Sequence, residues 1–230
     1  MPTLTWHGHS CFELEHDGKR VVIDPFLSGN PSADVKAAAL PHLDGVLVTH
    51  GHADHLGDAV PLAKRHHAAL VAPYELAQYC GERGVEDVHG MHIGGGHDFP
   101  FGHVKLVTAI HGGMVEGEAS MAKGGYTSFP CGFVVTMGGK HVYHAGDTAL
   151  TLDMQLLEGE VDVMLVPTGD NFTMGPADAA RAVGFVKPKV AIPMHYGTFP
   201  VIDTDPMAFK QAVGARAEVV ILRPGQSYSF

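Results

Sequence analysis

The sequence predicts an α/β fold with four layers, in which two mixed β-sheets pack face to face and helices lie outside them. Two observations support this prediction. The chain opens with short β-like runs joined as a hairpin, and strands then alternate with helices in both halves. Its 230 residues, 45% of them apolar, suit one domain with a sizeable core, and no linker or internal repeat divides them. We therefore expect a single domain over residues 1–230.

The first half of the chain is predicted to begin antiparallel. Three β-like runs come first, at residues 4–6, 11–15 and 20–23. Asp17-Gly18 lies between the second and third runs and is a typical hairpin turn. The apolar run 45–49 is short enough for a buried strand. After it we expect a helix over 57–67, a strand over 69–72, and a helix over 74–80 that Gly81 ends.

The second half is predicted to contain more strands and one clear helix. The strands are expected at residues 104–110, 133–137, 141–144, 161–166, 190–194 and 219–222. Gly138-Gly139 joins two of them as a hairpin turn. Pro176 suits the first turn of a helix that reaches residue 186, and Asp178 suits its N-terminal turn.

Charge and cysteine content exclude several classes of function. Fifteen Lys and Arg stand against 25 Asp and Glu, and the resulting net charge of −10 argues against broad binding to nucleic acid or anionic membranes. No apolar stretch approaches the roughly 18 residues of a membrane span, and the first ten residues do not resemble a signal peptide. Cys11, Cys80 and Cys131 lie too far apart for a thiolate zinc motif. We expect a cytoplasmic protein.

Histidine is the most unusual component of the chain, with 17 residues against 15 Lys and Arg together. Seven potential metal ligands follow the ends of four predicted strands: His50, His52, Asp54, His55, His111, Asp147 and His195. If those strand ends share one edge, the seven side chains converge. His50, His52 and Asp54 alternate as in an extended segment, whereas His55 points elsewhere.

Seven ligands are too many for one ion and suit two. Imidazole nitrogen favours zinc, while carboxylate oxygen also admits manganese, so two divalent ions, zinc or manganese, are expected. Two cations roughly 3.5–4 Å apart can share a water and lower its pKa towards neutrality. The hydroxide so formed attacks an ester-type bond, and no GxSxG motif for a serine nucleophile is present. The sequence predicts a dinuclear hydrolase.

Several motifs resemble those of the metallo-β-lactamase superfamily. They are the HxHxDH motif at residues 50–55 and the segments 8–10, 143–148, 167–176 and 195–200. Together these segments are similar to a branch of prokaryotic metal-dependent hydrolases that resembles L-ascorbate-6-phosphate lactonase. The resemblance implies an αββα sandwich. It also implies that His50, His52 and His111 bind the first ion, that Asp54, His55 and His195 bind the second, and that Asp147 bridges both.

Two positions qualify the resemblance. Gly112-Gly113 follows His111 where many relatives carry small hydroxyl residues. Asp147 stands where some zinc β-lactamases have a ligand cysteine, which argues against that antibiotic-cleaving subgroup.

Asp54 and Asp147 are the expected catalytic carboxylates, which orient the attacking water.

Substrate contacts are predicted from the residues around these motifs. The candidates are His9, His144, Asp170, Asn171 and Tyr196. The expected substrate is a small molecule with a phosphoester or phosphodiester bond. A sugar-phosphate lactone is the alternative, and an RNA-processing nuclease or a non-catalytic metal-binding protein are alternatives of other classes. Neither nucleic acid nor membrane is an expected partner, and the sequence leaves a homo-oligomer open.

Overall fold

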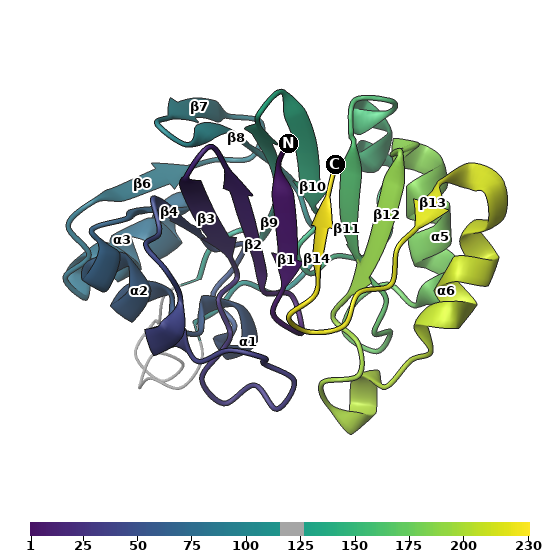
Figure 1. Cartoon of the computed structure of the whole chain (residues 1–230), viewed down its shortest axis with the longest axis horizontal. Coiled ribbons are helices and arrows are strands. Elements are labelled where there is room, and N and C mark those ends of the chain that lie inside the picture. Colours follow the sequence, from purple (N-terminus) through teal and green to yellow (C-terminus); the bar gives the residue numbers. More distant parts are fainter. Residues whose placement is uncertain (116–126) are drawn as a thin grey trace.

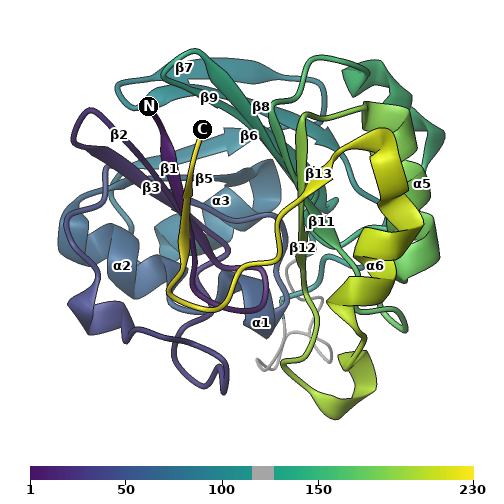
Figure 2. The ribbon, with the colours of Figure 1, turned by 45° about the vertical axis from the view of Figure 1, so that its right-hand side comes forward.

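The computed structural model describes residues 1–115 and 127–230. Within these ranges two seven-stranded mixed sheets pack face to face (Figure 1). Helices α2 (Ala59–His66) and α3 (Tyr74–Glu82) lie outside the first sheet. Helices α5 (Pro176–Val186) and α6 (Pro206–Val213) lie outside the second, as Figure 2 shows after a turn of the view. The predicted αββα arrangement is confirmed.

The first sheet combines an antiparallel and a parallel half. Its order is β14 (Ser227–Ser229), β1 (Thr3–Trp6), β2 (Phe12–His16), β3 (Lys19–Ile23), β4 (Gly45–Leu47), β5 (Ala69–Pro73) and β6 (Val88–Met91). Neighbours are antiparallel from β14 to β3 and parallel from β3 to β6. Asp17 and Gly18 both have positive φ, as the predicted hairpin turn requires.

The second sheet repeats this plan. Its order is β13 (Glu218–Val219), β12 (Val190–Met194), β11 (Val163–Pro167), β10 (Lys140–His144), β9 (Cys131–Met137), β8 (Gly102–Thr108) and β7 (Gly96–Phe99). Neighbours are parallel from β13 to β10 and antiparallel from β10 to β7. Gly138 and Gly139 have φ of 58° and 72° and form the predicted hairpin turn between β9 and β10.

Three apolar clusters fill the three spaces between the four layers. Adjacent residues on β4 illustrate how the strands divide them, because successive side chains of a strand point to opposite faces. Leu47 packs between the sheets together with Phe133 of β9, whereas Val46 packs towards α2 and α3. Val183 of α5 belongs to the third cluster, outside the second sheet. Both faces of each sheet are therefore covered, and the loops at the strand ends extend from this packed core.

The helix predicted over 57–67 is two helices. Helix α1 (Ala53–Leu56) precedes α2, and Gly57 separates them. Gly57 has a φ of 38°, and a Cβ there would lie 2.5 Å from the carbonyl oxygen of Pro25, so only glycine fits the break. In contrast, Gly81 does not end α3, which continues to Glu82.

The C-terminal prediction was also wrong. The strand expected over 219–222 ends at Val219, and the chain crosses back to the first sheet. There β14 pairs antiparallel with β1, with Tyr228 opposite Leu4. Strands β6 and β7 and helix α6 were not predicted. The described residues also include short 3₁₀ helices η1 (Ala37–Ala39), η2 (Leu152–Leu157), η3 (Pro200–Ile202) and η4 (Gly214–Arg216).

None of the helices in the described part of the chain has the length and apolarity that crossing a bilayer requires.

Candidate metal centre

The seven predicted ligands meet at one edge of the two sheets. His50, His111, Asp147 and His195 each follow a strand, namely β4, β8, β10 and β12, within three residues of its end. Asp54 and His55 lie on α1, at the lower edge of the molecule in Figure 1. The extended geometry predicted for this segment therefore holds only up to His52, which is the N-cap of α1. Rigid strands from both sheets thus position loops that carry polar side chains.

The first ligand group consists of His50, His52 and His111. One ring nitrogen from each of the three lies within 4.8 Å of the others. Nε2 of His50 is 3.0 Å from Nδ1 of His52, and neither atom has a carboxylate partner there. His50 is fully buried, whereas the side chain of His111 is 14% exposed, so this group opens towards solvent on one side.

The second ligand group contains Asp54, His55 and His195, with His9 beside them. One side-chain atom from each of the four lies within 4.8 Å of the others. Nε2 of His9 is 3.2 Å from Oδ2 of Asp54. Because a carboxylate only accepts, this nitrogen of His9 donates its hydrogen to Asp54. His9 therefore supports the carboxylate, and its Nε2 lone pair is not offered to an ion.

Asp147 lies between the two groups. Its Oδ1 is 3.3 Å from Nε2 of His55, and its Oδ2 is 3.0 Å from Nε2 of His195 and 3.5 Å from Nε2 of His111. The residue is 2% exposed. One carboxylate therefore reaches ligands of both groups, which is the position that the sequence resemblance implied for it.

Asp24 orients His55 from behind. Its Oδ2 accepts a 2.7 Å hydrogen bond from Nδ1 of His55, which leaves Nε2 of that ring facing Asp147. The same carboxylate accepts hydrogen bonds from the backbone N–H and the hydroxyl of Thr49, at 2.8 and 2.7 Å. Such carboxylate–histidine pairs fix the ring orientation of metal-binding imidazoles.

The hydroxyl of Thr49 extends this arrangement to His50. Because its hydrogen goes to Asp24, its oxygen can accept a hydrogen bond from Nδ1 of His50, 3.0 Å away. Nε2 of His50 then keeps its lone pair and faces His52. Asp24 therefore sets the tautomer of one imidazole directly and of a second through Thr49.

Charge in the site is arranged around His55. Burial alone would lower the pKa of His55, but the carboxylates of Asp147 and Asp24 raise it well above its usual value. For Asp147 and Asp24, burial acts to raise the pKa, yet the charge of His55 holds both below the usual range. Burial lowers the pKa of His50. The carboxylates of Asp147 and Asp24 are thus ionised and favour a proton on His55, which a cation at Nε2 of that ring would displace.

The donor set fits divalent ions. Nε2 of His55 and Oδ1 of Asp147 are buried and form no hydrogen bond with any described residue, although they face each other across 3.3 Å. An uncompensated buried polar atom is costly, and a bound cation would satisfy both atoms at once. Imidazole nitrogen and carboxylate oxygen at this spacing suit zinc and manganese.

Two of the predicted substrate contacts, His9 and His144, are fully buried. A substrate contact at either residue stays a prediction. Nδ1 of His9 is 2.9 Å from the hydroxyl of Thr198. His144 donates from Nε2 to the carbonyl of Ser10 and accepts at Nδ1 from the N–H of Gly146, next to Asp147. Both imidazoles therefore support candidate ligands from behind.

The other three predicted contacts lie on chain segments that adjoin His195. Asp170 and Asn171 are exposed and have positive φ, in the loop that continues from Gly169. A Cβ on Gly169 would lie 3.2 Å from Nδ1 of His195, so this loop passes close to that ring. Tyr196 is half-buried and stacks on Trp6 at 5.6 Å between ring centroids. Their contact with a substrate stays a prediction.

The two glycines after His111 have a steric reason. A Cβ on Gly113 would lie 2.0 Å from the carbonyl oxygen of Ser128, so no other residue fits there. A Cβ on Gly112 would lie 3.3 Å from the ring of His52. The chain therefore passes close to Ser128 at Gly113 and close to the ring of His52 at Gly112.

Sequence reasoning missed Asp24, Thr49 and Thr198. Asp24 did carry a usable signal, because it directly follows a predicted strand, as the ligands do. Thr49 and Thr198 carried none, since their roles depend on neighbours brought together by the fold.

The chain is similar to a known protein family and to several known proteins. Residues 3–195 match a family model described as a beta-lactamase superfamily domain. A UPF0173 metal-dependent hydrolase from Heliobacterium modesticaldum is 48% identical and aligns over 100% of this chain and 98% of its own length. Igni18, a metallo hydrolase from Ignicoccus hospitalis, is 34% identical, with a TM-score of 0.87 over 100% of this chain and 99% of its own.

A more distant structure shows the fold alone. The metallo-beta-lactamase fold protein YhfI from Bacillus subtilis is 15% identical to this chain. Its TM-score is 0.74, over the full length of both chains.

Proposed function

Because this chain belongs to the β-lactamase superfamily, among the UPF0173 metal-dependent hydrolases, we propose that it hydrolyses an ester-type bond of a small molecule at a two-metal centre. His50, His52 and His111 would hold one divalent ion and Asp54, His55 and His195 the other, with Asp147 shared. Zinc and manganese suit these ligands. A phosphoester or phosphodiester is the proposed substrate bond.

The position of Asp147 is the observation that carries this proposal. Its two oxygens face His55 on one side and His111 and His195 on the other, all within 3.5 Å. A carboxylate with donors of two separate ligand groups on its two oxygens is suited to bridge two cations. When bound, such a pair lowers the pKa of water and stabilises negative charge on the substrate.

Asp54 is suited to orient the attacking water. Its side chain is 31% exposed, whereas that of Asp147 is 3% exposed, so a small molecule reaches Asp54 more readily. The hydrogen bond from His9 holds Oδ2 of Asp54 in place. Burial acts to raise the pKa of Asp54, but the hydrogen bond from His9 and the charge of His55 hold it below its usual range. Asp54 is therefore ionised and accepts a hydrogen from water.

Space for a small substrate lies against the loop that follows His111. A pocket of about 210 Å³ is lined by Glu75, Thr127, Ser128 and Phe129. The N–H of Ser128 donates to the carbonyl of Gly113, two residues after His111, so this pocket adjoins the ligand loop. The ring of Phe129 is 82% exposed there and offers an apolar surface to a substrate. These features support a small molecule as the substrate.

The phosphoester proposal rests on charge. Two cations suit the oxygens of a phosphoryl group, which carry negative charge before and during the reaction. The net charge of −10 disfavours a long polyanion such as RNA, whose binding depends on many cationic contacts. A small phosphorylated metabolite therefore fits better than a nucleic acid.

Activity screening of the metal-loaded protein tests this proposal. The panel contains phosphodiesters, phosphomonoesters and lactones, each assayed with zinc and with manganese. We expect hydrolysis of a phosphoester and a loss of roughly a hundredfold or more in Asp54→Asn, because the substitution removes a charged ligand of the second ion.

Asp178→Asn is the matched control, since Asp178 is an exposed acid on α5, outside both ligand groups. Hydrolysis of lactones alone would contradict the phosphoester proposal. Undiminished activity in Asp54→Asn would contradict the proposed role of the centre.

A further inference from the structure

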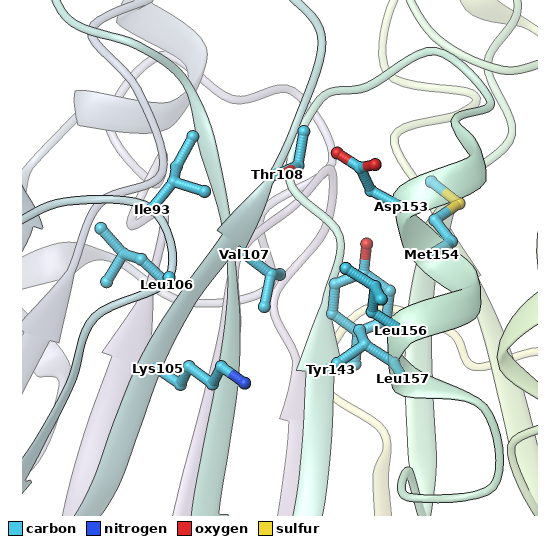
Figure 3. A pocket seen from close by; sticks show the side chains of 11 residues that line it. Ile93, Lys105, Leu106, Val107, Thr108, Tyr143, Asp153, Met154, Leu156 and Leu157 are labelled. Carbon is cyan, nitrogen blue, oxygen red and sulfur yellow. The ribbon is translucent and has the colours of Figure 1, made fainter.

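A pocket on the outer face of the second sheet lies apart from the seven candidate ligands. Its volume is about 180 Å³ (Figure 3). Strand β8 contributes one side, strand β10 contributes Tyr143, and η2 covers the opposite side. The lining is largely aliphatic, from Ile93, Val107, Met154, Leu156 and Leu157. An apolar cavity slightly smaller than this, about 150 Å³, is large enough to bind benzene.

The hydroxyl of Tyr143 points into this pocket without a partner. Tyr143 is 1% exposed, and no residue of the described ranges forms a hydrogen bond with its hydroxyl. Figure 3 shows this hydroxyl directed to the end of the pocket where Thr108 and Asp153 lie. A hydroxyl that reaches a pocket without a protein partner is available to a polar group bound there. Burial raises the pKa of Tyr143, so its hydroxyl stays neutral and can both donate and accept.

The walls of the pocket expose apolar side chains to solvent. Leu156 of η2 is 80% exposed and Ile93 on the opposite side is 41% exposed. Neighbouring exposed apolar side chains on a soluble domain commonly mark a binding surface. The pocket therefore combines a largely aliphatic lining with a polar end formed by Tyr143, Thr108 and Asp153, and Lys105 lies at the opposite end.

We propose that this pocket binds a short aliphatic molecule with a hydroxyl head, whose chain contacts Val107, Met154 and Leu157 and whose hydroxyl bonds with Tyr143. The aliphatic lining selects an alkyl chain. A hydroxyl matches the neutral donor and acceptor of Tyr143. A carboxylate head would lie beside the carboxylate of Asp153, where like charges repel.

The pocket is connected to the metal centre through two strands. Thr108 is the last residue of β8, and His111 follows it by three residues. Tyr143 lies on β10, four residues before Asp147. The two following loops are joined to each other, because the N–H of Ile110 donates to the hydroxyl of Thr148 at 3.0 Å. A ligand in the pocket therefore contacts the same strands that position two candidate ligands. The binding itself does not depend on the proposed hydrolysis.

Titration of the full-length protein with hexan-1-ol, followed by NMR, tests the proposal. We expect saturable binding, with the largest shifts at residues that line the pocket. Tyr143→Phe keeps the ring and removes the hydroxyl, so it should weaken binding roughly three- to tenfold. Val107→Phe should abolish binding by filling the cavity. Met207→Phe is the matched control, because Met207 is a 47% exposed side chain on α6, and its binding should equal that of the wild type.

Hexanoate has the same chain length and should bind at least tenfold more weakly than hexan-1-ol. Equal affinity for hexanoate would overturn the assignment of a hydroxyl head. Unchanged binding in both Val107→Phe and Tyr143→Phe, or no saturable binding to the wild type, would overturn the site. Analytical ultracentrifugation tests whether a second copy of the chain occupies this face instead. An oligomer that Leu156→Lys dissociates, together with no binding of hexan-1-ol, would show that it does and would overturn the proposal.

Discussion

The first ligand group consists of three imidazoles and opens to solvent at His111, whereas the second combines imidazoles with a carboxylate and is supported from behind. His9 holds Asp54, and Asp24 holds His55. In the first group, the support described for His50 comes through the hydroxyl of Thr49. The second group is therefore the more negative and the more firmly positioned of the two.

This difference indicates different preferences for metal ions. Imidazole-only coordination favours zinc, while an added carboxylate also admits harder ions such as manganese. The fixed positions of Asp54 and His55 reduce the ordering that an ion must impose when it binds. We therefore expect the two groups to respond differently to most substitutions, and in the same way only where they share a residue.

Asp147→Asn should have the largest effect, because Asp147 is the residue that faces both groups. Losing its charge weakens the binding of both ions. Activity should fall by roughly a thousandfold or more, since metal-ion catalysis supplies several kcal/mol. The kcat of the zinc- and manganese-loaded variant measures this. A variant that keeps one ion at full affinity would show that Asp147 serves a single group.

The stability of the protein should depend on pH through the titration of His9. Burial lowers the pKa of His9 to about 4, from 6.5, against the opposing hydrogen bond to Asp54. Between pH 6.5 and 4 the unfolded chain binds a proton at His9 that the folded chain does not, so stability falls as the pH falls. The shift corresponds to about 3 kcal/mol at pH 4.

Denaturant unfolding of the metal-free protein at pH 7 and pH 4 measures this loss. His9→Gln keeps a donor for Asp54 and cannot titrate, so its stability should fall by about 3 kcal/mol less than that of the wild type over this range. Equal losses in the two proteins would show that His9 already titrates normally in the folded state.

Asp24→Asn should weaken the binding of ions by roughly ten- to a hundredfold, as for other residues that orient a ligand. The effect should be larger for the second ion, because His55 bonds directly to Asp24 while His50 is linked only through Thr49. Competition with a chelator measures both affinities.

Asp34→Asn is the matched control for this substitution. It removes a comparable carboxylate that lies 2.8 Å from Nδ1 of His7, a histidine of neither ligand group. Equal weakening of ion binding by the two substitutions would contradict the specific role of Asp24.

Thr198→Val should have the smallest effect. It removes the hydroxyl beside Nδ1 of His9. The affinity for the second ion should fall by about two- to tenfold, which corresponds to the contribution of one hydrogen bond. Thr198→Ser restores the hydroxyl and should restore the affinity. If serine behaves like valine, the hydroxyl does not act through His9 and Asp54.

The candidate ligands could be recognised in the sequence because they occupy a compact motif and strand ends, and the fold brings them together. Buried strands such as β4 and β12 are apolar runs, and the polar residue that ends each run is visible without a structure. Local breaks were less predictable. Gly57 divides α1 from α2 because of its contact with the Pro25 carbonyl, which no local pattern contains.

The supporting residues could not be predicted for a similar reason. Asp24 and Thr49 are far apart in sequence and meet only because β3 and β4 pair in parallel. Likewise His9 and Thr198 come from opposite ends of the chain. Side chains that act through long-range contacts leave no periodic signal, whereas a ligand motif does.

Counting the metal ions bound per chain tests the central claim most directly. The protein is loaded with zinc or manganese, freed of excess ion and analysed by elemental analysis beside its Asp54→Asn and Asp147→Asn variants. We predict two ions per chain in the wild type, one in Asp54→Asn and fewer than one in Asp147→Asn. A wild-type protein that retains one ion or none after loading would contradict a two-metal centre.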